Sequence, residues 1–126
     1  MKKISTPSAP EPAGHYSQAI VCGGVVYVAG QLGKDAAGSG GPPSGAGAQT
    51  RQALHNLGAI LEAAGSGLGH VLQMTIYVSD IALWSEVNEA CAQVLGEHRP
   101  ARAIVPVGAF RDGYLLEILE IGRAHV

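Results

Sequence analysis

Arg102 and Glu117 are the two residues of this 126-residue chain whose types and spacing best suit chemistry. Arg102 directly precedes a β-rich segment over 103–107, and Glu117 lies within a second one over 114–121. If the two segments pair as a hairpin across the turn at 108–113, Arg102 lies diagonal to Glu117 on one face of a sheet. A carboxylate between Leu and Ile side chains is costly in free energy unless it is paired. We therefore expect the two side chains to lie close together.

The residues support two interpretations of this pair. In the first, a partly buried ion pair holds the hairpin or two subunits together. In the second, the planar guanidinium of Arg102 binds a substrate carboxylate, and Glu117 handles a water molecule or a proton. Glu120 points to the opposite face of the same segment, and its role is open.

Other common catalytic motifs are missing from the sequence. There is no nucleophile elbow, no phosphate-binding loop and no GxGxxG fingerprint. The five histidines never fall at HxH or HxxxH spacing, and Cys22 and Cys91 form no CxxC motif, so we expect no metal and no disulfide. Both cysteines are expected to be buried as small hydrophobic side chains.

The composition describes one small domain, 1–126, of 12.9 kDa. Only 14% of the residues are charged, which suggests that another copy of the chain covers part of the surface. The net charge of −2 supplies no basic field for nucleic acid. No apolar run is long enough to span a membrane and the N-terminus has no signal-peptide pattern, so we expect a cytoplasmic protein.

The hydrophobic pattern predicts a two-layer α+β or α/β domain, in which two helices pack on one face of a mixed sheet. Residues 1–12 are expected to form an irregular lead-in with a short strand at 3–5. Gly23-Gly24 predicts a hairpin turn, and Gly65 the end of the first helix. The glycine- and proline-rich segment 30–47 is expected to be a flexible loop. The predicted strands are 17–22, 25–29, 71–78, 103–107 and 114–121. The first predicted helix is 49–64. The second is capped by Ser79 or Asp80 and ends before Pro100.

Seven short segments occur in the order and spacing of motifs in a known family. They are GHYSQAI (14–20), VYVAGQL (26–32), the helix 49–65, VLQMTIYVSD (71–80), VNEA (87–90), RPAR (99–102) and LEI (116–118). On these residues, which span roughly 12–122, the chain resembles the Rid family of imine and enamine deaminases, also called YjgF or endoribonuclease L-PSP.

The resemblance implies a fold and an activity. The fold is chorismate-mutase-like, with six strands and two helices, in a homotrimer whose sites lie between subunits. The activity is the hydrolysis of 2-imino acids and their enamine forms to 2-oxo acids and ammonia, without a cofactor. The partners implied are the small imino acid and two further copies of the chain.

The resemblance also assigns roles to single positions. It implies that Arg102 binds the substrate carboxylate and that Glu117 handles the attacking water. The remaining positions would shape the pocket or accept a hydrogen bond from the imine, and they are Tyr16, Gly30, Asn88 and the backbone carbonyl near Ile104.

The chain departs from the family pattern at several of these motifs. His15 replaces a proline, Ala29 a serine, Ile104 a cysteine and Leu119 the second glutamate of the EIE motif, while 109–113 replaces the LPKG turn. The more apolar pocket leaves the preferred imine open. It also keeps a second function open, a trimer that binds small metabolites without converting them. A ribonuclease is disfavoured by the acidic composition and by the absence of a histidine pair for acid–base cleavage.

Overall fold

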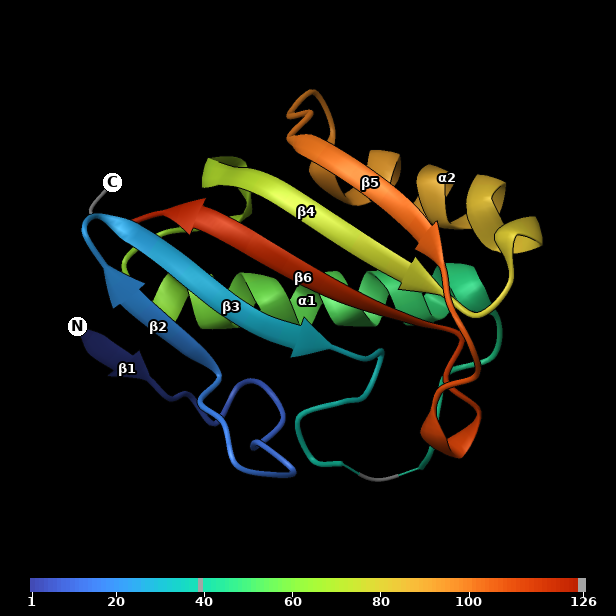
Figure 1. The fold of residues 1–126 in the computed structure, drawn as a ribbon, viewed down its shortest axis with the longest axis horizontal. Helices are drawn as coiled ribbons and strands as arrows, with labels where there is room; N and C mark the ends of the chain where they lie inside the picture. Colours follow the sequence, from blue (N-terminus) through green and yellow to red (C-terminus); the bar gives the residue numbers. More distant parts are fainter. Residues whose placement is uncertain (39, 125–126) are drawn as a thin grey trace.

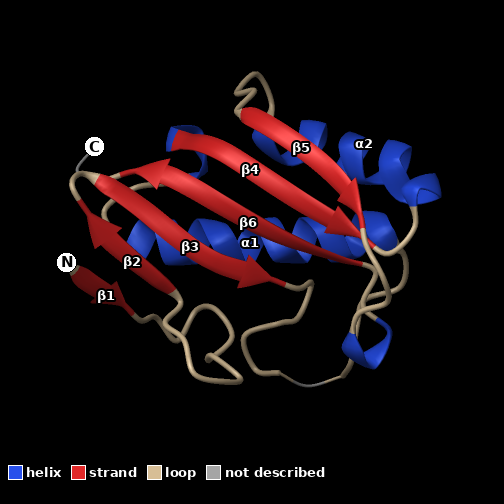
Figure 2. Cartoon of the chain, in the orientation of Figure 1, coloured by secondary structure: helices blue, strands red, loops and turns tan. Residues whose placement is uncertain are grey.

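A single six-stranded mixed sheet with two helices on one face forms the molecule (Figure 1, Figure 2). The structure is a computed structural model that describes residues 1–38 and 40–124. The strands, in the spatial order β1-β2-β3-β6-β4-β5, are β1 Lys2–Ile4, β2 Ala19–Cys22, β3 Val25–Gln31, β4 Val71–Val78, β5 Ala101–Pro106 and β6 Leu116–Arg123. The helices are α1 Ala46–Ala63 and α2 Trp84–Leu95, with short 3-10 turns η1 Leu68–His70, η2 Ile81–Leu83 and η3 Arg111–Gly113. The predicted α+β architecture is confirmed.

The hydrophobic core lies between the helices and the covered face of the sheet. Alternate residues of each strand point into it because side chains alternate between the two faces. The helical repeat of α1 supplies the opposite layer. The largest fully buried core side chains are Leu54, Leu57, Ile60, Leu61, Val26, Val71, Met74, Ile76, Val78, Leu116 and Ile118.

Both ends of α1 have identifiable caps. The helix begins three residues before the predicted start, and the carboxylate of Glu86 in α2 accepts a hydrogen bond of 3.1 Å from the backbone N–H of Gly47. At the other end Gly65 adopts a φ of 77°, and the N–H of Ser66 donates to the carbonyl of Leu61 at 2.8 Å. This is the Schellman closure that favours glycine, as predicted.

The predicted hairpin between the last two strands is wrong. β5 pairs in parallel with β4, and β6 runs antiparallel between β3 and β4 (Figure 1). The cause is the strand–helix–strand unit β4-α2-β5, whose crossover makes β5 the parallel neighbour of β4. Arg102 is therefore paired with Met74 on the covered face, whereas Glu117 is paired with Tyr77 on the open face. The expectation that Arg102 lies diagonal to Glu117 is wrong for the same reason.

A β-bulge interrupts β3 where it leaves the sheet. Val28 pairs with Glu120, but Gln31 pairs with Ile118, so β3 has one residue more than β6 between these pairs. Such bulges bend a strand and redirect its residues. Here the bulge turns Gly30 towards Glu117.

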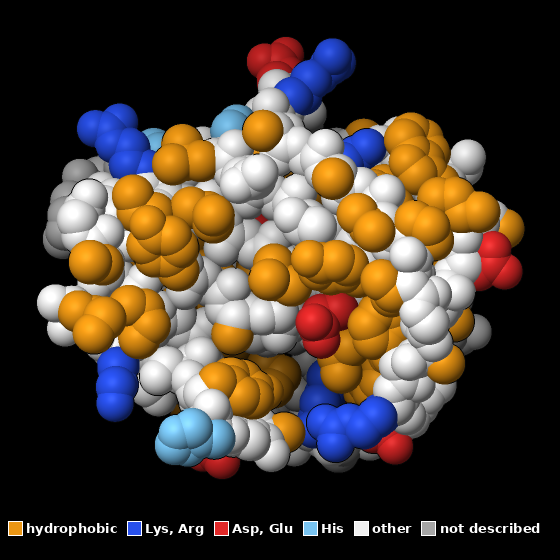
Figure 3. All heavy atoms as spheres, in the orientation of Figure 1, with side chains coloured by type: hydrophobic (Ala, Val, Ile, Leu, Met, Phe, Trp, Pro, Cys, Tyr) orange, Lys and Arg blue, Asp and Glu red, His pale blue; other side chains and the backbone are white. Residues whose placement is uncertain are grey.

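Patches of apolar side chains lie on the open face of the sheet, with an acidic group among them (Figure 3). Tyr27 is 49% exposed and Val105 37%, and between them Leu119 and Ile121 are half-buried.

Cys22 was expected to be buried, but it ends β2 at the hairpin turn and is exposed, whereas Cys91 is buried as predicted. None of the described helices has the length and hydropathy needed to cross a membrane.

Candidate functional site

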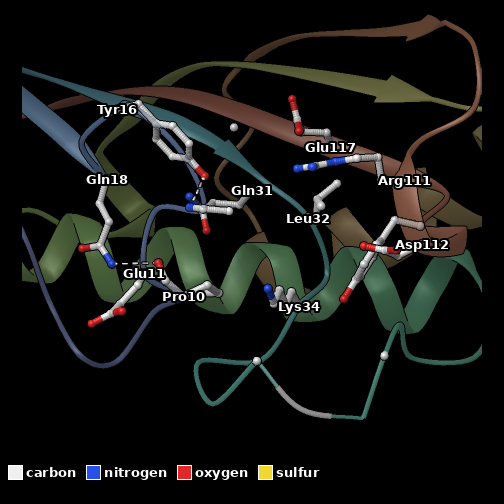
Figure 4. Close-up of a pocket in the computed structure, with 15 residues that line it drawn as sticks. Pro10, Glu11, Tyr16, Gln18, Gln31, Leu32, Lys34, Arg111, Asp112 and Glu117 are labelled. Atoms are coloured by element: carbon white, nitrogen blue, oxygen red, sulfur yellow. Dashed lines mark hydrogen bonds between the residues drawn. The ribbon is translucent and has the colours of Figure 1, made fainter.

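A cleft of about 290 Å³ opens where β3 and β6 leave the sheet (Figure 4). Its walls come from three segments that are distant in sequence, which are the lead-in before β2, the loop after β3, and η3 with the start of β6. Three of the six predicted site residues, Tyr16, Gly30 and Glu117, line this cleft. Arg111 and Lys34 also line it, although the sequence analysis gave them no role.

Glu117 lies directly against the backbone of Gly30. A Cβ atom added to Gly30 would stand 2.6 Å from Oε1 of Glu117 and 2.8 Å from its Cδ. These distances are shorter than any ordinary contact, so only glycine leaves room for the carboxylate in this position. The bulge in β3 and the absence of a side chain at Gly30 together set the place of the carboxylate.

Tyr16 forms part of the opposite wall of the cleft. Its hydroxyl accepts a hydrogen bond of 3.1 Å from the N–H of Ala13, and its own N–H donates to the carbonyl of Gly14 at 3.0 Å. These bonds fold the lead-in into a tight turn, and the ring remains 52% exposed. Figure 4 shows the ring facing the side of the cleft that holds Glu117.

The buried amide of Gln18 holds the lead-in against the sheet. Its Nε2 donates to the carbonyls of Thr6 at 3.1 Å and Pro10 at 3.0 Å, and its Oε1 accepts from the N–H of Thr6 at 2.7 Å. Buried polar groups are satisfied in this way when no regular secondary structure is available. One side chain therefore fixes the wall that includes Pro10.

Two amides on α1 hold the loop after β3. Asn56 donates from Nδ2 to the carbonyl of Lys34 at 2.7 Å. Gln49 donates to the carbonyl of Pro43 at 3.0 Å and accepts from the N–H of Leu115 at 2.8 Å. No sequence motif marks these two residues. They could have been found because both are polar amides at helix positions that lie on the same side of α1 as its apolar stripe, which faces the core.

The other three predicted residues lie together at the β5 edge of the sheet. Nη1 of Arg102 donates to Oδ1 of Asn88 in α2 at 2.8 Å, and its guanidinium carbon is 5.6 Å from the centroid of the Trp84 ring. Both contacts orient a planar cation that is otherwise exposed. Ile104 follows Arg102 on the same face and is half-buried against the core.

Within the chain the two groups of residues are far apart. Arg102 pairs with Met74 of β4 and Glu117 pairs with Tyr77 of β4. These two partners are three positions apart, which is about 10 Å along the strand. The strands that bear them flank β4, about 10 Å from each other, and the side chains leave opposite faces. One small molecule cannot contact both residues of the same chain.

A second carboxylate, Glu120, is buried behind the sheet. It is 2% exposed, and neither carboxyl oxygen has a hydrogen-bond partner among the described residues. Burial raises its pKa to about 8, so the group is mostly protonated at neutral pH. Nearby, burial raises the pKa of the Cys91 thiol to about 11, although the charge of Arg102 opposes that shift.

The comparison with known proteins now identifies the family. The profile of the family described as Endoribonuclease L-PSP matches residues 6–123. The chain belongs to this family. Family members of known structure share its fold at full length. RidA from an Antarctic Psychrobacter species is 37% identical, with a TM-score of 0.92 over 98% of this chain and 99% of the other.

Two further members of the Endoribonuclease L-PSP family bear on the activity. The bovine 2-iminobutanoate/2-iminopropanoate deaminase is 40% identical over 117 residues, which cover 93% of this chain and 85% of the enzyme. Escherichia coli TdcF, solved with bound serine, is 31% identical with a TM-score of 0.92 over 99% of this chain and all of the other. The resemblance to the Rid family is confirmed.

Proposed function

We propose that this chain is an imine deaminase that hydrolyses 2-imino acids and their enamine forms to 2-oxo acids and ammonia. The observation that carries the proposal is the carboxylate of Glu117, held against Gly30 in a cleft of metabolite size. Relatives at about 40% identity that are named imine deaminases support the same reaction.

Glu117 acts as the acid–base group. It takes a proton from a water molecule while the water oxygen attacks the imine carbon, and the C=N electron pair moves to nitrogen. The protonated Glu117 then gives its proton to the nitrogen of the tetrahedral intermediate. Glu117 next carries the proton of the new hydroxyl group to the same nitrogen, the C–N bond breaks as the C=O bond forms, and ammonia leaves. An imine carbon is already electrophilic, so the protein supplies mainly position and a proton carrier.

Arg102 binds the substrate carboxylate from a second copy of the chain. In a homotrimer, Arg102, Asn88 and the carbonyl near Ile104 of one protomer face Tyr16, Gly30 and Glu117 of the next. The separation of these groups within one protomer supports this arrangement, as do the apolar side chains on the open face of the sheet. A planar guanidinium suits the bidentate recognition of a carboxylate.

A semicarbazide competition assay tests the reaction. An amino-acid oxidase generates the 2-imino acids in place, and semicarbazide traps whatever imine survives. We expect the wild-type chain to suppress semicarbazone formation, and Arg102→Ala and Glu117→Gln to lose this effect by about a hundredfold or more. The matched control is Arg51→Ala, an exposed arginine outside the cleft.

A glycine variant tests the position of Glu117 without changing its chemistry. Gly30→Ala forces the carboxylate to move, because the clash is with the end of a flexible side chain. We expect most of the activity to be lost with little change in the melting temperature. Full activity in Gly30→Ala would contradict the proposed geometry. If the wild-type chain binds 2-oxo acids but hydrolyses no imine, it is a metabolite-binding protein instead.

A further inference from the structure

Two basic side chains of the cleft have no part in the proposed hydrolysis. Arg111 and Lys34 line the cleft together with Glu117, while the substrate carboxylate is assigned to Arg102 of a neighbouring copy. Within the described part of the chain, neither Arg111 nor Lys34 forms an ion pair within 4.0 Å. Uncommitted cations that border a cleft are available to an anionic ligand.

The backbone of Arg111 is fixed by its surroundings. Asp112 and Gly113 have φ values of 60° and 79°, which reverse the chain in a tight turn, and the N–H of Tyr114 returns to the Arg111 carbonyl at 3.3 Å. Tyr114 is itself buried beneath the cleft. Figure 4 shows the Arg111 side chain extending into the cleft below Glu117.

Lys34 approaches from the loop wall. Its carbonyl is held by Asn56, and its side chain is half-buried. Its Nζ lies 3.8 Å from the position that a Cβ would take at Gly38, another residue of the cleft. Arg111 and Lys34 thus contribute positive charge from two different walls.

Three acidic residues, Glu11, Asp112 and Glu117, line the same cleft, and among the described residues none of them forms an ion pair with Arg111 or Lys34. The carboxylate of Glu11 points away from Arg111 in Figure 4. Asp112 acts on the Tyr114 hydroxyl, whose pKa is raised by burial first and then by the charges of Asp112 and Asp35. Glu117 faces the cleft, where the proposed reaction uses it.

We propose that the cleft prefers 2-imino acids whose side chain ends in a second carboxylate, and that Arg111 binds this carboxylate with Lys34 in support. The inference rests on the imine deaminase function proposed above. The cleft has a volume of about 290 Å³ in one chain, and in the proposed assembly a neighbouring copy covers its open side. The guanidinium of Arg111 offers a charge-assisted, bidentate contact to the distal carboxylate.

Substrate comparison on the intact protein tests the inference. Amino-acid oxidases generate imines from aspartate and glutamate, or from alanine and 2-aminobutanoate, and semicarbazide traps what remains. We expect the wild-type chain to have the higher kcat/KM for the dicarboxylic imines. Arg111→Ala should lower this value about ten- to hundredfold, as expected for a lost charge-assisted contact, and lower the value for the neutral imines by a clearly smaller factor. Arg51→Ala serves as the control.

Two results would overturn the assignment. Equal activity of the wild-type chain on both kinds of imine removes the proposed preference. An equal loss on both kinds in Arg111→Ala assigns Arg111 to the common carboxylate or to Glu117 instead. Lys34→Ala provides a second variant, for which we expect a smaller loss in the same direction.

A binding measurement separates this inference from the proposed function. Calorimetry compares 2-oxoglutarate with 2-oxobutanoate, in the wild-type chain and in Arg111→Ala. Tighter binding of the dicarboxylate that disappears in the variant supports the inference, even if no imine is hydrolysed and the proposed function fails. Equal affinity for the two ligands contradicts it, even if the chain hydrolyses imines.

Discussion

A glutamate inside an apolar core ties the stability of a fold to pH, and Glu120 is such a residue. Its pKa is about 8 in the folded chain, against an ordinary value of 4.5. The folded state therefore holds a proton that the unfolded chain releases between these values. The stabilisation that protonated Glu120 gives to the folded state is fully present below pH 4.5 and is lost as the pH rises through 8. The total change in the free energy of unfolding is on the order of 3–5 kcal/mol.

Replacing the charge should remove this dependence. We expect Glu120→Gln and the wild-type chain to have similar free energies of unfolding at pH 5, and the variant to be the more stable by a few kcal/mol at pH 8.5. Urea unfolding at a series of pH values measures the difference. Glu89→Gln, an exposed glutamate of α2, is the control. Parallel curves for Glu120→Gln and the wild type would show that Glu120 ionises as easily as a surface group.

Single residues were predicted from sequence only where a motif marked them. Tyr16, Gly30 and Glu117 lie in one cleft, and Arg102 contacts Asn88 at 2.8 Å. Their proposed catalytic roles remain predictions. In the sequence, Arg111 stands out only because 109–113 departs from the family turn. Its place in the cleft could not be predicted, because it depends on which loop the fold brings opposite to it.

At the level of elements, the helices and strands follow the hydrophobic pattern closely, but their pairing does not. β4 has the predicted bounds and α1 carries the predicted apolar stripe, whereas in α2 Val87 and Cys91 are buried but Trp84 and Val94 are exposed. The positions of β5 and β6 in the sheet were not predicted correctly. The alternation of apolar and polar residues along a strand shows which face of the sheet a side chain lies on, but not which strand lies beside it. The strand–helix–strand spacing of β4-α2-β5 could have indicated parallel pairing.

The loop after β3 is better held than its composition indicates. Glycine and proline content alone predicted a flexible segment, since it contains no hydrophobic repeat. The structure ties its backbone to α1 at Lys34 and Pro43 through Asn56 and Gln49. Long-range contacts of this kind cannot be found from the composition of the loop itself.

Removing one of these ties should loosen the loop. Asn56→Ala leaves the carbonyls of Leu32 and Lys34 without their donor, and we expect a loss of about 1–3 kcal/mol in stability. Hydrogen exchange of the amides at 33–38 should become faster. Gln52→Ala is the matched control, because among the described residues the side chain of Gln52 bonds that of Asn56 and no backbone group of the loop. Unchanged exchange at 33–38 in Asn56→Ala would mean that other contacts hold the loop.

At the level of the whole molecule, the separation of Arg102 from Glu117 makes the proposed site a property of the assembly. Two inactive variants should then restore one another. If Arg102→Ala and Glu117→Gln chains are co-expressed, some interfaces receive the intact Arg102 of one copy and the intact Glu117 of another. Random mixing gives about a quarter of such interfaces in a cyclic oligomer.

We expect the mixed preparation to recover roughly that share of the wild-type imine hydrolysis. Each variant expressed alone, at the same total concentration, is the control. Sedimentation of the wild-type chain gives the number of copies independently. A mixture as inactive as its components would assign each complete site to a single chain and contradict the proposed trimer arrangement.

The bond between Glu86 and Gly47 has a consequence for how the chain folds. Its two partners are 39 positions apart in the sequence. The Glu86 carboxylate can therefore accept from the first turn of α1 only after α2 has packed against α1. At the other end of α1 the closing backbone bond, from the N–H of Ser66 to the carbonyl of Leu61, is local, although the Ser66 hydroxyl also donates to the carbonyl of Arg123. We therefore expect α1 to nucleate near its C-terminal end and its first turn to order late, together with the loop that precedes it. In that order of events, the cleft is completed only as folding ends.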